Sequence, residues 1–330
     1  MKIVEFGNTK ERLSEMCLGT MMFGDRCSEA ESDRITAMAI DAGVNFIDTA
    51  AMYCDGLTEE ILGRIFKKMG GRDKLFIATK VHKGVDRESI LKSIDESLAR
   101  LKMDYVDLYM IHWPKKGMSP NEMMEALAKV VESGKTLFVG CCNYPAWLLA
   151  HHNAIARCND WPAFVCNQIP YNLIERGPEV EVLPQAVAEN IAITCYRVLV
   201  LGLLTGKYKP GAPIPGNSRG ESDERIGAWL NQYANGITKF LTFAQELNIR
   251  PSELAISWIR YSPAVTNPII GVSSESQLQS SLNAFEFDLT AEQYAKITNF
   301  FDTEVKEESG GAYKGLRREL KLLETPNIDD

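Results

Sequence analysis

Short apolar runs alternate with longer amphipathic segments along most of the chain. Runs of four to seven residues with few polar side chains are typical of strands buried on both faces. Such runs predict eight strands, at Met16–Gly19, Asn45–Asp48, Phe76–Lys80, Asp107–His112, Leu137–Cys142, Phe164–Ile169, Ile191–Arg197 and Val265–Ile270. Apolar residues recur at helical spacing between several of them, which predicts helices that include Ala30–Ala42, Glu88–Leu101, Asn121–Ser133, Val180–Asn190 and Gln277–Ala284.

The alternation of strand and helix predicts an α/β fold with parallel strands and helices outside the sheet. Eight such units favour a closed (β/α)8 barrel, the TIM-barrel architecture, over an open doubly wound sheet. Ser28 is placed to cap the first helix and Gly43 to follow its end. No linker divides the sequence, so we expect a single domain over residues 1–330.

Three segments lie outside the repeating pattern. Residues 2–13 predict a β-hairpin around Gly7 and Asn8 that closes the floor of the barrel. A long insertion, residues 206–261, separates the seventh and eighth strands and begins with a Pro/Gly-rich loop at 209–220. It continues with helices near Asn235–Leu247 and Ser252–Tyr261, and an insertion of that length is more often functional than idle. A charged C-terminal tail, about residues 301–330, is expected to pack loosely as a helix.

The overall charge limits the classes of partner. The chain has 36 basic and 44 acidic residues and a formal net charge of -8, which disfavours broad binding to nucleic acid or anionic membranes. No apolar run is long enough to span a bilayer, and residues 1–9 lack the apolar core of a secretory signal. We therefore expect a cytoplasmic protein whose partner is a small molecule, while the oligomeric state does not follow from the sequence.

The 8 cysteines show no CxxC spacing, and several stand in apolar runs. Cysteine in such a setting behaves as a small buried hydrophobe, which predicts reduced structural thiols. With 4 histidines and no HExxH pattern, no metal site is expected.

Four polar residues fall at or just after the carboxyl ends of predicted strands, where barrels of this kind place their active sites. They are Asp48, Lys80, His112 and, five positions past Asp48, Tyr53. Taken singly, the aspartate could cap a helix, the lysine could be solvated and the histidine could simply be hydrogen-bonded. Together they suit carbonyl reduction. A nearby ammonium lowers the pKa of a phenol, a carboxylate keeps the ammonium charged, and a neutral imidazole orients a carbonyl oxygen.

Seven segments in order resemble the signatures of the aldo-keto reductase superfamily: NFIDTAAMY, FIATK, LYMIHWP, VGCCN, NQIPYNLIER, YRVLVLGLLTGKY and PIIGVSSESQL. The NLIER and LLTGK elements are most similar to the branch with bacterial sugar and aldehyde reductases and potassium-channel β subunits. The resemblance implies a (β/α)8 barrel that reduces an aldehyde, ketone or sugar carbonyl with NAD(P)H. It also implies that Asp48, Tyr53, Lys80 and His112 form a catalytic tetrad in which Tyr53 is the general acid.

The chain lacks a GxGxxG turn after the first strand, so the Rossmann mode of dinucleotide binding is not indicated. The resemblance implies instead that a nicotinamide dinucleotide lies extended across the barrel mouth. Asn143 and Gln168 match residues that bind the carboxamide, and Tyr196 matches the aromatic residue that stacks on the nicotinamide. The pyrophosphate would lie against Leu199–Gly202 and Lys207, with Arg219 of the insertion as a candidate clamp. The complete set of expected cofactor contacts is Gly19, Thr20, Met21, Asp48, Cys142, Asn143, Gln168, Tyr196, Arg197, Leu199, Gly202, Lys207, Arg219, Gly271, Ser273, Gln277, Ser280 and Ser281.

Several positions depart from the family pattern. Cys142 replaces a hydroxyl donor, and Arg197 stands where serine is usual, so Arg197 either contacts a phosphate or points to solvent. Members that prefer NADPH often carry arginines where this chain has Ser273 and Gln277, and charge-assisted bonds are the strong ones. NADP(H) is the expected cofactor from the resemblance, with NAD(H) as the alternative.

The expected substrate pocket combines an apolar floor with one polar corner. Its lining would come from Met21, Phe23, Met52, Tyr53, His112, Trp113 and Tyr144. Such a pocket suits small or aromatic aldehydes or the face of a sugar, and Lys115 and Lys116 could serve a phosphate. The alternatives are a nucleotide-binding regulatory subunit with slow chemistry, and a barrel lyase or isomerase without a redox cofactor.

Overall fold

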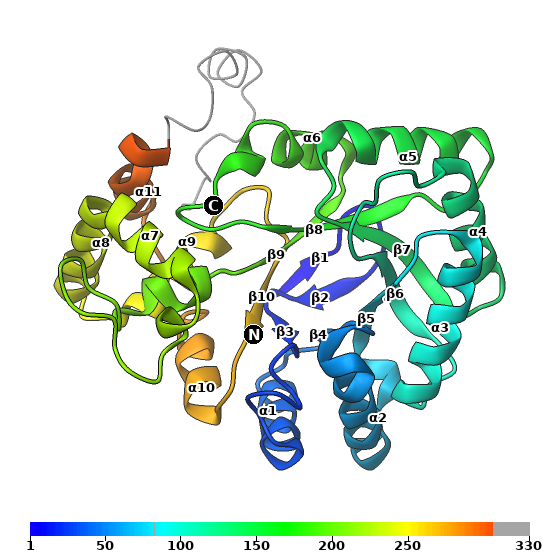
Figure 1. Ribbon diagram of the computed structural model, residues 1–330, viewed down its shortest axis with the longest axis horizontal. Helices are drawn as coiled ribbons and strands as arrows, with labels where there is room; N and C mark the ends of the chain where they lie inside the picture. Colours follow the sequence, from blue (N-terminus) through cyan, green and yellow to red (C-terminus); the bar gives the residue numbers. More distant parts are fainter. Residues whose placement is uncertain (82, 306–330) are drawn as a thin grey trace.

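A closed barrel of eight parallel strands forms the centre of the protein. The computed structural model describes residues 1–81 and 83–305 (Figure 1). Around the barrel the strands follow the order β10-β3-β4-β5-β6-β7-β8-β9, and every neighbouring pair is parallel. Their bounds are β3 Cys17–Gly19, β4 Phe46–Asp48, β5 Phe76–Lys80, β6 Val106–Ile111, β7 Thr136–Cys142, β8 Phe164–Pro170, β9 Ala192–Tyr196 and β10 Asn267–Gly271. The predicted eight strands are confirmed, with ends displaced by one or two residues at most positions.

Helices surround this barrel, as Figure 1 shows. The α-helices are α1 Glu29–Asp41, α2 Leu57–Met69, α3 Arg87–Leu101, α4 Pro120–Glu132, α5 Ala146–Cys158, α6 Val182–Glu189, α7 Glu224–Gln232, α8 Ala234–Glu246, α9 Pro251–Arg260, α10 Glu275–Asn283 and α11 Ala291–Val305. Short 3-10 helices are η1 Tyr53–Gly56, η2 Arg72–Lys74, η3 Gly177–Glu179, η4 Val200–Thr205 and η5 Arg219–Glu221. The first helix begins as predicted, because Ser28 and Glu31 form a reciprocal capping box.

Two apolar layers hold the barrel together. Strand side chains that point outward pack beneath the helices in one large cluster, and those that point inward form a second, smaller cluster. All six residues of β6, Val106–Ile111, are buried, as expected for a parallel strand covered on both faces. Six of the eight cysteines are buried in these layers, and two, Cys54 and Cys158, are half-buried and exposed.

An N-terminal hairpin closes the floor of the barrel. Strands β1 Ile3–Glu5 and β2 Arg12–Ser14 pair antiparallel, which confirms the predicted hairpin. Phe6 is buried, with its ring 5.6 Å from that of Phe46 and 5.3 Å from that of Phe76. At Gly7, which has φ of 56°, a Cβ would stand 2.7 Å from the amide nitrogen of Ala192. Because Phe46, Phe76 and Ala192 begin their strands, the hairpin lies against the end of the barrel opposite the mouth.

The predicted insertion between the seventh and eighth barrel strands is present between β9 and β10. It follows η4 and contains η5 and the helices α7, α8 and α9, of which α8 and α9 match the two predicted helices to within one residue. The sequence pattern does not single out α7. At the C-terminus, α11 packs against α8, and the rest of the predicted helical tail, residues 306–330, lies outside the described residues. Within the described residues no helix is long and apolar enough to cross a membrane.

Candidate functional site

The carboxyl ends of β4, β5 and β6 bring the four predicted tetrad residues to one side of the barrel mouth. Asp48 ends β4, Lys80 ends β5, His112 follows β6 directly, and Tyr53 begins the 3-10 helix η1 after β4. The parallel register sets Asp48 beside Ala78 and Lys80 beside Met110. Because neighbouring parallel strands end at the same edge, residues 32 positions apart in sequence become neighbours in space.

The buried Lys80 ammonium is the centre of the hydrogen-bond network. It donates to the Asp48 carboxylate at 2.8 Å, to the Thr49 carbonyl at 2.8 Å and to the Tyr53 hydroxyl at 3.3 Å. These three acceptors match the three hydrogens of an ammonium group. Burial is the largest single effect on Lys80 and disfavours its charged form, but Asp48, Tyr53 and Cys142 together outweigh it, so the pKa of Lys80 lies above its ordinary value.

The Tyr53 hydroxyl accepts a hydrogen from Lys80, so its own hydrogen points to another partner. Burial raises the pKa of Tyr53 to about 12, while the Lys80 charge opposes this shift and the Asp48 charge adds to it. The ammonium lowers this pKa, as the sequence analysis expected, but desolvation of the phenolate is the larger effect and raises it. Tyr53 holds its proton throughout the neutral range.

His112 lies beside the Tyr53 ring. The two ring centroids are 6.1 Å apart at an interplanar angle of 79°, and the His112 side chain is half-buried. The backbone of His112 is fixed by Asn143, whose Nδ2 donates to its carbonyl at 3.2 Å. Tyr53 and His112 therefore face the same small region above the barrel.

Amides and an aromatic ring continue the site along β7, β8 and β9. The Tyr196 hydroxyl donates to Oδ1 of Asn143 at 2.7 Å, and Nε2 of Gln168 donates to Oδ1 of Asp48 at 2.8 Å. Asn143 has φ of 62°, and its amide donates to the Gln168 carbonyl at 2.9 Å. The carboxamide side chains predicted to recognise nicotinamide are thus brought together with Tyr196 and linked to the tetrad through Gln168. Their donors and acceptors fit an amide ligand.

The predicted cofactor residue Cys142 has a less accessible position. It is buried, its sulfur lies 3.9 Å from that of Met110, and burial raises its thiol pKa well above the ordinary value. On the opposite side of the mouth, the Thr20 hydroxyl donates to the Asp48 carbonyl at 2.9 Å. Gly19 pairs with Gly271 across β3 and β10, and Met21 is 45% exposed at the start of the following loop.

The loop after β9 has the backbone shape of an anion cradle. Val200, Leu201 and Gly202 all have positive φ, of 50°, 55° and 95°, an arrangement that non-glycine residues rarely adopt. Lys207 folds back over this bend, with Nζ 3.0 Å from the position of a Cβ on Gly202. Leu199 precedes the bend, and Arg219 begins η5 in the insertion, half-buried. Bend and cation together suit a pyrophosphate.

The Arg197 side chain is engaged by neighbouring residues. It therefore does not extend freely into solvent, and it would not meet a phosphate as an unpaired cation. Its Nη1 donates to Glu175 at 2.8 Å, and its guanidinium lies 5.2 Å from the centre of the Tyr196 ring. Asn172 donates both to Glu175 and to the Arg197 carbonyl, which ties the β8 loop to the β9 loop. Glu175 is absent from the predicted site residues, because an acidic side chain inside NLIER carries no local sign of the strand end that it meets.

The four polar residues after β10 divide into two pairs. Ser273 donates through its backbone amide and its hydroxyl to Oε1 of Gln277; Ser273 is half-buried and Gln277 is exposed. Ser280 and Ser281 are buried: the first donates to Glu253 at 3.2 Å and the second to the Gln277 carbonyl at 2.9 Å. Ser280 and Ser281 are expected cofactor contacts, but in the structure their hydroxyls serve the packing of α10 on α9 and the α10 backbone.

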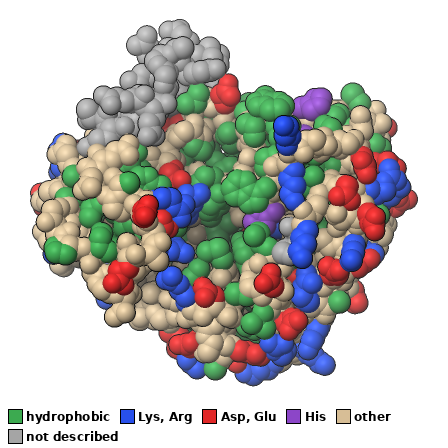
Figure 2. Space-filling model, viewed as in Figure 1, with side chains coloured by type: hydrophobic (Ala, Val, Ile, Leu, Met, Phe, Trp, Pro, Cys, Tyr) green, Lys and Arg blue, Asp and Glu red, His purple; other side chains and the backbone are tan. Residues whose placement is uncertain are grey.

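The predicted substrate residues also divide by exposure. Met52 and Trp113 are 45% and 50% exposed beside Tyr53 and His112 in sequence. Phe23 and Tyr144 are fully buried, and the Tyr144 hydroxyl lies 3.8 Å from the Met123 sulfur. The prediction that Phe23 and Tyr144 line the pocket is therefore not supported, because both belong to the layer under the helices. Figure 2 shows an apolar hollow in the middle of this face, with basic side chains on its rim.

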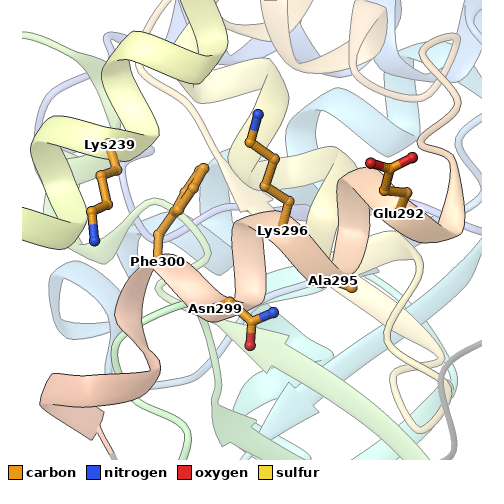
Figure 3. A pocket seen from close by; sticks show the side chains of 6 residues that line it. All are labelled: Lys239, Glu292, Ala295, Lys296, Asn299 and Phe300. Carbon is orange, nitrogen blue, oxygen red and sulfur yellow. The ribbon is translucent and has the colours of Figure 1, made fainter.

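A separate depression of about 510 Å³ lies on α8 and α11, two helices that contribute none of the residues described so far in this site (Figure 3). Its floor includes Phe300, and its rim carries Lys239, Lys296 and Glu292. The Lys296 ammonium lies 4.1 Å from the Phe243 ring centre. None of the predicted site residues lines this depression.

Comparison with known proteins adds a family likeness that covers most of the chain. The family model described as "Aldo/keto reductase family" matches residues 15–302. Protein tas of Escherichia coli is 30% identical over 323 residues, covering 86% of this chain and 93% of that protein. Uncharacterized oxidoreductase YrpG of Bacillus subtilis is 31% identical over 319 residues, covering 91% and 96%. A protein of Arabidopsis thaliana named "Probable voltage-gated potassium channel subunit beta" is 30% identical over 301 residues, covering 87% and 92%.

Proposed function

Since this chain belongs to the aldo/keto reductase family of oxidoreductases, we propose that it reduces the carbonyl of an aldehyde, ketone or sugar with NAD(P)H. The observation that carries the proposal is the Asp48–Lys80–Tyr53 chain of hydrogen bonds at the barrel mouth. It places a protonated phenol, held by a buried ammonium, beside an imidazole and a pair of amides. A nicotinamide, when bound, supplies the hydride that adds to the carbonyl carbon.

Tyr53 then supplies the proton to the carbonyl oxygen. Its pKa of about 12 leaves it protonated at neutral pH, yet it is a far stronger acid than an alcohol, so proton transfer to a developing alkoxide is favourable. Lys80 stabilises the phenolate that remains, because it already donates to the Tyr53 oxygen. Asp48 balances the lysine charge inside the barrel, and His112 orients the carbonyl oxygen beside Tyr53.

Asn143, Gln168 and Tyr196 would hold the nicotinamide, and the Leu199–Gly202 bend with Lys207 would hold the pyrophosphate. The family resemblance favours NADPH. Ser273 and Gln277 supply hydrogen bonds without positive charge for a ribose phosphate, so we expect a weaker preference for NADPH over NADH than paired arginines would give.

A nucleotide-binding regulatory role is the second candidate, and the similarity to the Arabidopsis channel subunit favours it. In that role the same mouth binds the nicotinamide nucleotide while turnover is slow. Binding and turnover therefore have to be measured on the same preparation.

The deciding experiment is a fluorescence titration with NADPH and with NADH, followed by steady-state reduction of two neutral aldehydes, glyceraldehyde and methyl 4-formylbenzoate. Binding of a nucleotide with steady turnover is the expected result. Stoichiometric binding without turnover would support the regulatory role instead. Binding of neither nucleotide would overturn both.

The matched variants are Tyr53→Phe and Tyr105→Phe. Tyr105 stands just before β6, at the floor end of the barrel, under the Arg72 guanidinium. We expect Tyr53→Phe to bind the nucleotide as the parent does and to lose about 10²- to 10⁴-fold in kcat, the range typical of a general acid. Tyr105→Phe should keep the parent kcat, and equal rates for the two variants would remove Tyr53 from the mechanism.

A further inference from the structure

The loops after β5 and β6 carry positive charge that no nearby carboxylate neutralises. They contain Lys83, Lys115 and Lys116, all exposed, against a single acidic residue, Asp86. The Asp86 carboxylate is engaged by the amide and hydroxyl of Ser89, as the cap of α3. Among the described residues none of the three lysines forms an ion pair. This local excess stands out in a chain whose formal net charge is -8.

Several arginines around the mouth have a carboxylate neighbour. Arg197 is paired with Glu175 at 2.8 Å, Arg225 with Asp223 at 2.7 Å, and Arg26 approaches Asp25 at 4.0 Å. Lys207 and Arg219 form no ion pair among the described residues either, but they belong to the segment expected to hold the pyrophosphate. The unpaired cations without an expected cofactor role that lie closest in sequence to the tetrad are therefore those after β5 and β6, the strands that end at Lys80 and Ile111. In Figure 2 basic side chains lie along the rim of the apolar hollow.

Chain length keeps these lysines close to the reacting groups. Lys83 is three residues past Lys80, and Lys115 is three residues past His112. Three residues span at most about 11 Å when fully extended, so both α-carbons lie within that distance of a tetrad residue. The Lys115 ammonium also donates to the Lys83 carbonyl, which joins the two loops and holds this charge in place.

Exposed apolar side chains stand next to the tetrad residues in the sequence. Trp113, half-exposed, stands between His112 and Lys115 in the chain, and Met52, 45% exposed, precedes Tyr53. A ligand that reaches from the tetrad to the lysines would thus meet an acidic proton donor, then an apolar face, and finally a cationic rim. A carbonyl compound with an anionic group at its far end has this order of properties.

We propose that the lysines after β5 and β6 select substrates with a carboxylate or phosphate remote from the carbonyl. This inference rests on the proposed reductase function and assigns its substrate class. Because all three ammonium groups are exposed, each contact is screened and adds a modest amount, about three- to tenfold in kcat/KM for the group as a whole. The preference should appear mainly in KM, since the anion is bound equally before and during the reaction.

The test compares carbonyl compounds that differ in charge. 4-Carboxybenzaldehyde is paired with methyl 4-formylbenzoate, and glyceraldehyde 3-phosphate with glyceraldehyde. We expect the parent protein to prefer the anionic member of at least one pair, and the preference to fall when ionic strength rises from about 0.05 to about 0.5 M. Preference confined to the first pair identifies a carboxylate as the anion, and preference confined to the second identifies a phosphate.

Variants locate the preference on the molecule. Lys83→Met and Lys116→Met leave the Lys115 contact in place and should each reduce the anionic-to-neutral ratio of kcat/KM. Lys10→Met is the matched control, an exposed lysine in the hairpin at the opposite end of the barrel, and should keep the parent ratio.

The outcomes separate this inference from the function on which it rests. Turnover of the neutral aldehydes with parent ratios near one overturns the inference and leaves the reductase function standing. A high parent ratio that is unchanged in both lysine variants overturns the assignment to these loops. No turnover of any of the four compounds, with either nucleotide, overturns the reductase function and the inference together.

Discussion

At the scale of single residues, buried polar groups at the barrel mouth differ in whether they have partners. Lys80 donates to three acceptors, and Glu59, fully buried, accepts from Thr79 at 2.6 Å and from Arg100 at 2.7 Å. By contrast, the buried Thr49 hydroxyl has no hydrogen-bond partner among the residues that the structure describes. Loss of a partner from a buried charge is costly, whereas loss of an unpartnered hydroxyl is not.

The first prediction contrasts two buried threonines in neighbouring strand ends. Thr79→Val removes a hydrogen from the Glu59 carboxylate, and we expect it to lower the free energy of unfolding by about 1–3 kcal/mol. Thr49→Val removes no hydrogen bond, so we expect a change between zero and a gain of about 1 kcal/mol. Urea denaturation of both variants measures the difference, and an equal loss in both would contradict the argument.

The second prediction concerns pH. Carbonyl reduction needs Tyr53 with its proton, and the pKa of about 12 means that this form persists across the accessible range. The rate of reduction should therefore be level between about pH 6 and pH 10. Alcohol oxidation needs the phenolate, a small fraction below pH 12, so its rate should rise about tenfold per unit of pH over that interval.

Both pH profiles are measured on one preparation, with circular dichroism to show that the fold persists at the alkaline end. A reduction rate that falls with an apparent pKa near 8 would show that Tyr53 loses its proton far more easily than its burial implies.

At the scale of elements, close helix packing explains features that look alike in the sequence. Gly63 lies within α2, where a Cβ would stand 2.4 Å from the Arg100 carbonyl oxygen at the end of α3. Gly227 lies within α7, and a Cβ there would meet no atom within 4 Å. Both glycines interrupt a helical pattern, but only the first permits two helices to approach.

The third prediction uses these glycines as a matched pair. Gly63→Ala should destabilise the protein by about 1–3 kcal/mol, because backbone atoms of α3 have to move away. Gly227→Ala should stabilise it by up to about 1 kcal/mol through helix propensity. Thermal unfolding of both variants gives the comparison, and stabilisation by Gly63→Ala would show that the helices adjust at little cost.

At the scale of the whole molecule, the proposed active site lies at one end of the barrel and the N-terminal hairpin closes the other. The tetrad and amides stand at the carboxyl ends of the strands, while the hairpin and Phe6 close the other end. The aromatic rings of Phe6, Phe46 and Phe76 contact one another there, with Phe46 and Phe76 5.1 Å apart. Stability and chemistry are thus assigned to opposite ends of one sheet, as is usual for this architecture.

The fourth prediction separates the two ends. Phe6→Ala should cost about 3–5 kcal/mol of stability, as is typical for a buried aromatic residue, while the folded fraction keeps the parent KM for aldehyde. Trp147→Ala, at a 66% exposed position on α5, is the control and should change stability by less than about 1 kcal/mol. A raised KM in Phe6→Ala would show that the floor influences the mouth.

Patterns in the sequence were enough to predict the eight strands, the hairpin, the insertion and the four polar residues at strand ends. Each of these leaves a local pattern, either in hydrophobic spacing or in residue type after a strand. Because parallel strands end at one edge, the strand positions alone predict that Asp48, Lys80, Tyr53 and His112 lie close together.

The surroundings of each polar group, in contrast, could not be predicted from the sequence and are seen only in the tertiary structure. It places Phe23 and Tyr144 in the core, turns Ser280 toward Glu253, and pairs Arg197 with Glu175 across two loops. It also adds to the lowering of the Tyr53 pKa by Lys80 a larger rise from desolvation, which depends on all neighbours and not only on the charged ones. Side-chain direction and burial are set by contacts between distant segments, and such contacts leave no local pattern along the chain.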